Sequence, residues 1–401
     1  MFAEIVRFTG VSARNFIKYP KRSGLAPSSS LSIFAAIFLI LSAVLAPHAN
    51  ANPFNLDAAA SPDTITAEEW AQYARRFVGP DGRVIDVDNG GQSHSEGQGY
   101  GMLIALAAGQ RADFDRVWSF ARKNLQVRRD ALFSWRWTPH AKVTDDNNAS
   151  DGDILIAYAL VKAAVKWHEP RYLHAAFPII EDIGESLITQ EQGLTVLRPA
   201  SFGFDEIPLN GGPVLNLSYY IYPAFLLFEA THPQYPWGTL IRDGLALTEA
   251  ARFGSADLVP DWIALRREGT INIAHGFAAK SSYDAVRIPL YMMLGGHTPR
   301  ALSTLNRSWR AVGNGTPADY HLGQDRSVGE MRDPGYRMIG ALMACATEGA
   351  TIPAFLSQFQ PTTYFASSLH LLALSTAREH FSDCLEPFPS YEMAYSGNAI
   401  R

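Results

Sequence analysis

The chain has 401 residues, a formal net charge of −5 at pH 7 and 11% aromatic residues. Residues 1–51 hold five basic residues and one acid, which leaves 29 basic and 38 acidic residues, a net charge near −9, in the rest. Such an acidic body argues against nucleic acid or an anionic membrane as a partner and favours a neutral polymer.

The first 51 residues have the pattern of a secretory signal peptide. A basic segment is followed by an apolar run at 31–46 and by Ala49-Asn50-Ala51, a small-x-small cleavage site. The apolar run is slightly too short to span a bilayer, so an uncleaved membrane anchor is the less favoured alternative. We expect cleavage after Ala51, no stable membrane insertion, and a mature protein in the periplasm or outside the cell. Residues 52–401 are treated as one catalytic domain.

The chain after this leader is predicted to be mostly helical. Apolar residues recur with a helical period over a dozen segments, and Thr66 followed by Glu68 and Glu69 suits a helix start. A dozen helices joined by irregular loops suggests two concentric rings of helices, although the periodicity itself indicates only an all-α protein with short β excursions. The expected helices are 67–77, 99–108, 112–125, 151–167, 172–190, 217–231, 237–253, 282–293, 299–312, 335–347, 352–358 and 363–381; the expected strands are 83–87, 194–198 and 259–265.

Cysteine and metal-ligand patterns predict no cofactor and no metal. Cys345 and Cys384 are the only cysteines; they can pair in an oxidising compartment, and a buried free thiol is at least as good an interpretation. The acidic run at 145–153 superficially resembles a calcium loop. In that register Asp151 stands where glycine is needed and Ala157 where a bidentate Glu belongs, so we reject the interpretation.

The first of three acidic segments is Ser95-Glu96-Gly97-Gln98-Gly99-Tyr100-Gly101-Met102. Glu96 precedes a predicted helix, and the three glycines are expected to keep side-chain bulk away so that a ligand can approach. One alternative is an acid that the helix dipole favours. Another is a phosphate loop, which is disfavoured because the lysine and the preceding strand are missing.

The second and third acidic segments also stand at the starts of predicted helices. Asp151 and Asp153 open one helix, where simple helix capping is the alternative interpretation. Asp284 and Arg287 are three residues apart, which places them on one face of another helix. An ordinary surface ion pair is the alternative there.

Paired carboxyls suggest hydrolysis of a glycosidic bond. That reaction needs a proton for the leaving oxygen and a base that activates water, and two carboxyls of different pKa supply both without a metal. We expect Glu96 as the acid, kept protonated by an apolar or anionic surround, and Asp284 as the base, kept ionised by Arg287. The sequence gives no distance between them.

Aromatic and polar side chains supply a candidate sugar-binding cleft. Trp135 and Trp137 lie on one side of the chain if it is extended, and an indole face suits the C–H face of a pyranose. Core packing is the alternative, and for most of the eight Trp it is the better one. The candidate substrate-binding residues are Tyr100, Trp135, Trp137, Asp153, Asn216, Tyr219, Tyr220, Tyr283 and Arg287, with Trp262 and Ser218 as further candidates.

These motifs together resemble glycoside hydrolase family 8, and within it the periplasmic endoglucanases associated with bacterial cellulose synthesis. The likeness rests on four segments in the family's order, spread over nearly the whole mature chain. Leu217 stands where the family commonly has proline. The segments are 95–102, Ala149-Ser-Asp151-Gly-Asp153, Asn216-Leu-Ser-Tyr-Tyr220 and Ser282-Tyr283-Asp284-Ala285-Val-Arg287.

The resemblance implies an (α/α)6 barrel with an open cleft across the ends of its inner helices. It implies endo-acting hydrolysis of a β-1,4-glucan such as cellulose, with inversion, by a monomer linked to the export machinery of cellulose synthase. Glu96 takes the general-acid position, Asp284 the general-base position, and Asp151 that of an acid which binds the distorted sugar. Inversion predicts acid and base carboxyls about 6.5–9.5 Å apart.

Three alternatives stay open at this point. Other branches of the same family act on xylan or chitosan. A non-cleaving glucan-binding or export subunit would keep the aromatic cleft but has little use for Glu96, Asp151 and Asp284 together. A polysaccharide lyase on a related helical toroid would take a polyanionic substrate, which a body charged near −9 disfavours.

Overall fold

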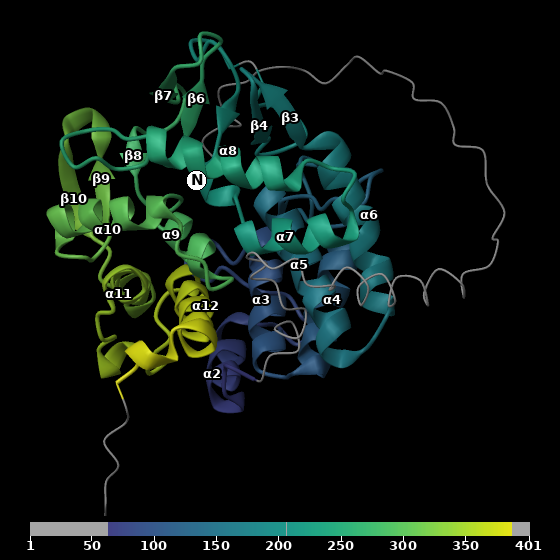
Figure 1. The fold of residues 1–401 in the computed structure, drawn as a ribbon. Helices are drawn as coiled ribbons and strands as arrows, with labels where there is room; N and C mark the ends of the chain where they lie inside the picture. Colours follow the sequence, from purple (N-terminus) through teal and green to yellow (C-terminus); the bar gives the residue numbers. More distant parts are fainter. Residues whose placement is uncertain (1–62, 206, 387–401) are drawn as a thin grey trace, which may run out of the picture. The chain divides into compact units, whose positions relative to one another are not determined.

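The computed structural model describes residues 63–205 and 207–386, and the predicted signal peptide lies outside them. The described residues form eleven α-helices and ten short strands (Figure 1), and none of these helices has the length and apolar character needed to span a bilayer. The helices are α2 (Ala67–Phe77), α3 (Ser95–Ala107), α4 (Arg111–Asn124), α5 (Ser150–Trp167), α6 (Arg171–Ser186), α7 (Tyr222–Thr231), α8 (Trp237–Ala250), α9 (Arg287–Met293), α10 (Arg300–Gly313), α11 (Pro334–Glu348) and α12 (Tyr364–His380).

The helices form an (α/α)6 barrel, in which outer helices enclose an inner ring. Each inner helix packs against the next, in the order α3, α5, α7, α9, α11 and α12, and α12 packs back against α3 to close the ring. From outside, α4 packs on α3, α6 on α5, α8 on α7, and α10 on α11. The predicted all-α double ring is therefore confirmed, and its helices can be followed in Figure 1.

Burial distinguishes inner from outer helices. In α5 every residue from Ser150 to Val161 is buried, because neighbours pack on all its sides and its sequence is apolar almost all round. In α2 the buried residues form one stripe. This helix begins with the expected capping box, in which Glu69 N–H donates to the Thr66 hydroxyl and Thr66 N–H donates to the Glu69 carboxylate.

The strands form four small antiparallel sheets outside the helical ring, in the orders β1–β2, β3–β4, β5–β6–β7 and β10–β9–β8. Three of these sheets hold the backbone immediately before a candidate site segment. Strand β1 ends one residue before α3, β5 ends just before Asn216, and β8 ends just before the turn that carries Asp284. The strands are β1 (Ser93–His94), β2 (Arg136–Trp137), β3 (Ile188–Glu191), β4 (Leu194–Leu197), β5 (Val214–Leu215), β6 (Ile263–Leu265), β7 (Ile271–Ile273), β8 (Lys280–Ser281), β9 (Ala318–His321) and β10 (Arg326–Glu330).

Five predicted helices are shorter than expected by three residues or more. The helix predicted at 237–253 ends at Ala250, and Phe253 forms an isolated bridge with Leu258. The helix predicted at 172–190 ends at Ser186, because the following residues pair as β3 with β4 across a two-residue turn whose Gln192 and Gly193 both have positive φ. The helix predicted at 217–231 is split into the 3-10 turn η3 (Leu217–Tyr219) and α7, whose first turn contains proline.

The other two differences concern 282–293 and 352–358. The first begins as a helix only at Arg287, so Asp284 lies in a turn before α9. The second holds only the 3-10 turn η5 (Ala354–Leu356). The strand predicted at 83–87 was wrong as well, since this segment makes isolated bridges rather than a ladder.

The two cysteines form a disulfide. Cys345 lies on α11 and Cys384 in the 3-10 turn η6 (Ser382–Cys384), with their Cα atoms 6.0 Å apart. The sequence left a disulfide and a free thiol open, and the structure has the disulfide. It ties the segment after α12 back to the barrel.

Candidate active site

Four charged side chains from three separate segments meet at one end of the inner ring. Arg287 lies at the centre, with only 3% of its side chain exposed. Its guanidinium donates to the carboxylates of Glu96, Asp151 (2.9 Å) and Asp284 (2.6 Å), and to the hydroxyl of Ser218 (2.8 Å). The three acidic segments singled out in the sequence therefore converge on one cation.

Glu96 and Asp151 are brought together by the close approach of two helix starts. Each lies in the first turn of its helix, α3 or α5, where the helix dipole favours an acid. Gly152 allows the approach, because a Cβ at this position would overlap the side chain of Ser95 and the backbone of Glu96. Gly152, next to Asp151, is thus a packing requirement of the cluster.

We had expected the glycines beside Glu96 to leave space for a ligand, but they do not. A Cβ on Gly97 would overlap the hydroxyl of Tyr364, and one on Gly99 would overlap Leu155. Gly101 is similarly covered by valine side chains. These glycines are needed because protein side chains already fill the space in front of them.

Exposure separates the three acids. The side chains of Glu96 and Asp284 are 19% and 15% exposed, whereas that of Asp151 is 4% exposed. Glu96 and Asp284 contact the two terminal nitrogens of the same guanidinium. The oxygens of Glu96 and Asp284 that contact Arg287 are therefore at most about 8 Å apart, which is the length of two hydrogen bonds plus the width of the guanidinium group. A ligand held over Arg287 can therefore reach both.

The electrostatics of the cluster are set by burial as well as by Arg287. Burial, together with the charge of Glu96, raises the pKa of Asp284, and Arg287 lowers it without reversing that rise, so the expected effect of the arginine is present but outweighed. Burial and the neighbouring Glu96 raise the pKa of Asp151, again against the influence of Arg287. Proton uptake by Asp151 relieves the repulsion among three carboxyls that share one cation.

A pair of phenols orients Glu96. Tyr100 is fully buried, its hydroxyl donates to Glu96 at 2.8 Å, and the same hydroxyl lies 2.7 Å from that of Tyr291. Because Tyr100 gives its one proton to Glu96, Tyr291 must donate to Tyr100. Tyr100 was expected to bind substrate, but its burial makes it a support for Glu96. We missed Tyr291, although its spacing of four residues from Arg287 places both on one helix face.

The segment at Asn216 places a hydroxyl and an aromatic ring against Arg287. The Asn216 side chain accepts from the N–H (3.0 Å) and the hydroxyl (2.6 Å) of Ser218, which directs Ser218 toward Arg287. The ring of Tyr219 lies 5.5 Å from the guanidinium carbon of Arg287. Tyr220 points into the core instead, where its hydroxyl accepts from Leu197 N–H at 2.9 Å, so it does not face this cluster.

The two tryptophans expected in the cleft are nearly buried. Trp135 stacks on His94 with ring centroids 6.0 Å apart and donates to Asp145 at 2.9 Å. Trp137 packs edge-on against Phe120, and the cations of Arg83 and Lys142 lie over its ring. Protein groups cover both indoles, so the arrangement favours the core-packing alternative that the sequence left open.

Asp153 and Tyr283 have opposite environments. Asp153 is fully buried and accepts from Phe133 N–H (2.8 Å) and the Asn148 amide (2.7 Å), and its burial raises its pKa to about 7. It therefore stabilises the loop before α5 and does not face a ligand. Tyr283 is 45% exposed beside Asp284 and packs edge-on against Tyr336. Its ring is an open aromatic surface next to the acids.

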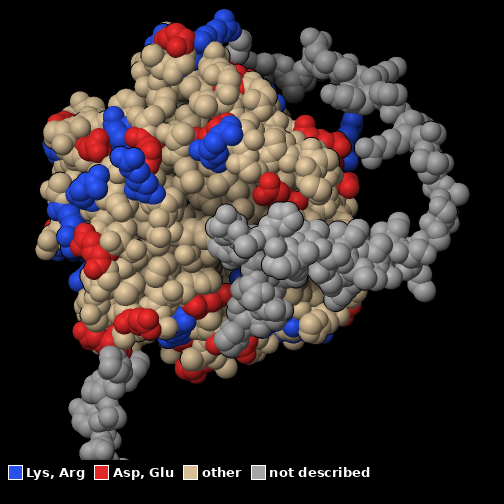
Figure 2. All heavy atoms as spheres, in the orientation of Figure 1, with Lys and Arg blue, Asp and Glu red and all other residues tan. Residues whose placement is uncertain are grey.

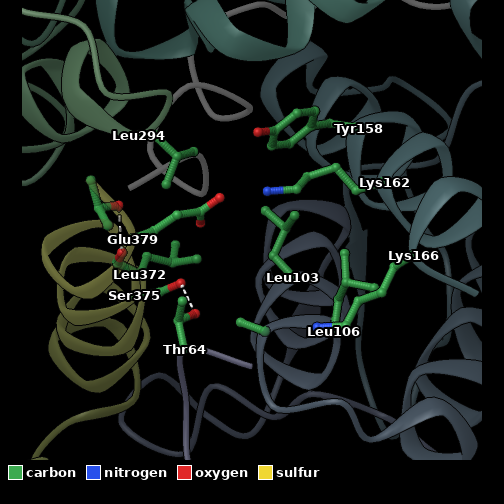
Figure 3. A pocket seen from close by; sticks show the side chains of 12 residues that line it. Thr64, Leu103, Leu106, Tyr158, Lys162, Lys166, Leu294, Leu372, Ser375 and Glu379 are labelled. Atoms are coloured by element: carbon green, nitrogen blue, oxygen red, sulfur yellow. Dashed lines mark hydrogen bonds between the residues drawn. The ribbon is translucent and has the colours of Figure 1, made fainter. Parts of the chain in front are cut away.

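A separate cavity lies at the opposite ends of α3, α5 and α12 (Figure 3). Its lining includes Leu106 of α3, Lys162 of α5 and Glu379 of α12, and Figure 3 shows the last two pointing into it. Along α3, Leu106 is about 15 Å from Glu96 at 1.5 Å per residue. This cavity is therefore distinct from the acid cluster.

The structure is an (α/α)6 barrel in which three carboxyls contact one arginine, and two of these carboxyls are accessible. This is the architecture and chemistry of a glycoside hydrolase. Residues 48–379 match the family described as glycosyl hydrolases family 8, and the chain belongs to this family. The resemblance noted in the sequence is confirmed.

Individual relatives agree with this placement. The chain is 38% identical over 327 residues to a protein named probable endoglucanase from Novacetimonas hansenii, a match that covers 80% of this chain and 93% of that protein. It is 40% identical over 226 residues to an endoglucanase of Cellulomonas uda, which covers 56% and 62% of the two chains. Among solved structures, endo-beta-1,4-glucanase CMCax from Acetobacter xylinum matches with a TM-score of 0.70 and 35% identity over 81% of this chain and 99% of that one.

Proposed function

We propose that this protein is an endo-β-1,4-glucanase that hydrolyses internal bonds of a cellulose-type glucan with inversion. The observation that carries the proposal is the convergence of Glu96, Asp151 and Asp284 on Arg287, with two of the acids within reach of a ligand. The names of the relatives support the substrate class. On the face drawn in Figure 2, acidic and basic side chains are interspersed around a broad area that bears neither, which suits an uncharged polymer.

In the proposed reaction Glu96 donates a proton to the oxygen of the glycosidic bond as the bond to the anomeric carbon breaks. A water molecule attacks this carbon from the opposite face of the sugar, and Asp284 takes one of its protons. The new C–O bond has the inverted configuration. Glu96 then regains a proton from solvent and Asp284 releases one, so both acids return to their initial states.

The neighbouring groups have supporting roles in this scheme. Arg287 holds the acids in one geometry, and Tyr100 fixes the carboxyl of Glu96. Asp151 is 4% exposed and lies beside Glu96 on the same guanidinium, and the family resemblance gives it the role of binding the hydroxyls of the sugar at the cleavage point. Tyr283 is the exposed ring against which a neighbouring pyranose would stack.

We also propose that the protein acts outside the cytoplasm, as a monomer, during the export of bacterial cellulose. The basic leader, the apolar run at 31–46 and the site Ala49-Asn50-Ala51 support secretion. Mass spectrometry of the exported protein is expected to find Asn52 as its first residue. An exported protein that retains the apolar run would instead support a membrane anchor.

The first experiment measures hydrolysis of carboxymethyl cellulose by the purified protein, with xylan and chitosan in parallel. An endo-acting enzyme lowers the viscosity early, when few reducing ends have formed, and proton NMR of the first products should show the α-anomer. Glu96→Gln and Asp284→Asn should each lower kcat by about 10²–10⁴-fold, the usual contribution of general acid–base catalysis. Glu185→Gln, which changes an acid on α6 away from the cluster, is the matched control.

The possible outcomes discriminate between the alternative functions. Cleavage of xylan or chitosan in place of cellulose would keep the acids and replace the substrate. Glucan binding without cleavage by the unaltered protein would favour a binding or export subunit. Products that absorb in the ultraviolet would indicate a lyase. A β-anomer as first product would refute inversion.

A further inference from the structure

A fourth buried carboxyl lies behind the turn that carries Asp284. Asp261 lies two residues before the start of β6, is buried, and was not identified from the sequence. One of its carboxylate oxygens accepts from Ser282 N–H at 2.7 Å and from Ala285 N–H at 2.9 Å. These two donors stand on either side of Asp284, so Asp261 holds the backbone at both ends of the segment that presents it.

The turn at 282–286 has a need for such an acceptor. Val286 N–H donates to the Ser282 carbonyl at 3.0 Å, so a helical turn that continues into α9 begins at Ser282, and the N–H groups of Ser282 and Ala285 have no carbonyl partner within it. A hydroxyl at the start of the segment commonly accepts them, but within the described residues the hydroxyl of Ser282 makes no hydrogen bond. Asp261 supplies the cap from the loop before β6.

Asp261 is itself firmly placed. Its own N–H donates to the carbonyl of Lys280 at 2.8 Å, which ties it to β8. The next residue, Trp262, packs in one cluster with Phe204 (centroids 5.5 Å apart) and Phe277 (4.5 Å), and β6 is the middle strand of its sheet. The cap therefore sits on a rigid support.

We propose that Asp261 is a positioning residue for the hydrolytic reaction, which fixes the turn bearing Asp284 so that this carboxylate meets Arg287 and the attacking water. The proposal rests on the assignment of Asp284 as general base in the function proposed above. Asp261 acts only through the backbone of residues 282 and 285 and does not contact the sugar.

The protonation state of Asp261 determines which variant mimics it. Burial, and next the charge of Asp284, raise its pKa, so the neutral acid is favoured near pH 7. A neutral carboxyl has a carbonyl-type oxygen for the two N–H groups, and an asparagine amide offers the same oxygen in the same place. Asparagine should therefore preserve the cap, and alanine should remove it.

The test compares Asp261→Asn and Asp261→Ala by steady-state hydrolysis of a soluble cello-oligosaccharide. The alanine variant should lose about 100-fold in kcat, the size of effect that a displaced catalytic group produces, with KM nearly unchanged. The asparagine variant should retain kcat within about fivefold, because both hydrogen bonds survive. Added formate, a small carboxyl that can occupy the vacated site, should partly restore kcat of the alanine variant.

Asp243→Ala is the matched control. Asp243 is likewise buried and accepts a backbone N–H, that of Thr195 at 2.8 Å, but it lies on α8 and touches none of the four clustered residues. Its loss should lower the midpoint of thermal unfolding and leave kcat per folded molecule unchanged. Circular dichroism establishes that each variant is folded before its activity is measured.

The outcomes separate this inference from the proposed function. Wild-type kcat in folded Asp261→Ala, while Asp284→Asn is inactive, would overturn the positioning role and leave the function intact. Full activity of Asp284→Asn would overturn the assignment of the base. If Asp261→Ala does not fold, a loss of kcat well beyond fivefold in folded Asp261→Asn would also overturn the proposal.

Discussion

Replacing Arg287 by methionine tests the electrostatic account of the cluster. Methionine keeps much of the length of the side chain and removes the cation, so the three carboxylates lose their common partner. Breaking a buried ion pair from one side costs about 3–5 kcal/mol, because the remaining charge is left uncompensated. The guanidinium is almost fully buried and contacts all three acids, so we expect the free energy of unfolding at pH 8 to fall by an amount in this range.

The size of this loss should depend on pH. Arg287 lowers the pKa values of Asp151 and Asp284, which burial raises. Without it the folded-state pKa values rise further above the unfolded ones. An acid with a raised folded pKa stabilises the fold at low pH, and this contribution disappears as the pH rises through the folded value. The difference in free energy of unfolding between the variant and the wild type should therefore be smaller at pH 5 than at pH 8. It should shrink by about 2 kcal/mol if the pKa values of the carboxyls rise by about one and a half units in total.

Urea unfolding at pH 8 and pH 5, followed by circular dichroism, measures both numbers, provided that the m-values agree. Arg378→Met is the control, since Arg378 is also partly buried but pairs with one carboxylate, that of Glu69, at 2.7 and 2.8 Å. Its loss should be smaller and less dependent on pH. A loss below about 1 kcal/mol for Arg287→Met at pH 8, or the same loss at both pH values, would refute the account.

Three further predictions concern activity and stability. Tyr100→Phe removes the hydroxyl that donates to Glu96, so kcat should fall about tenfold with KM unchanged in steady-state assays on a soluble glucan, because Tyr100 is buried. Because burial raises the pKa of Asp284 and the base must be ionised, kcat/KM measured from pH 3.5 to 8 should fall on the acid side at a pH above the ordinary aspartate value of 3.8; a flat profile down to pH 4 would contradict this. Replacing Cys345 and Cys384 by alanine opens a loop of 39 residues and should cost about 4 kcal/mol in the chain-entropy account, seen as a lower midpoint of thermal unfolding with kcat retained.

Local signals predicted the helices well because each helix is decided mainly by its own residues. The capping box at Thr66 and the apolar run after Ser150 specify where α2 and α5 begin without reference to the rest of the chain. The strands were predicted poorly. Strand β10 is exposed along its whole length, so it has no apolar alternation, and it exists because it pairs with β9. Pairing with a distant segment leaves little trace in a short polar sequence.

The site divides in the same way. Glu96, Asp151 and Asp284 stand out in the sequence because each lies in or beside the first turn of a helix, among glycines and small polar residues. Their supports do not stand out. Asp261 is 23 residues from Asp284 in sequence and accepts two tertiary hydrogen bonds from the backbone N–H groups of Ser282 and Ala285, on either side of Asp284. Trp135 and Trp137 were preferred as sugar-binding residues, but an indole suits a sugar and a protein core equally well. Only the packing around the ring distinguishes the two environments.

The division of labour within the barrel follows from these observations. The apolar inner helices, such as α5 and α12, bury nearly every residue and so hold most of the hydrophobic stabilisation. The strands are only two to five residues long and contribute few of the buried residues, yet β1, β5 and β8 each end directly before a segment of the acid cluster. Because the cluster gathers three carboxyls around one cation, small displacements change the balance of repulsion and attraction within it. The sheets therefore contribute to the precision of the site more than to the stability of the ring, and mutations in them should reduce activity before they unfold the barrel.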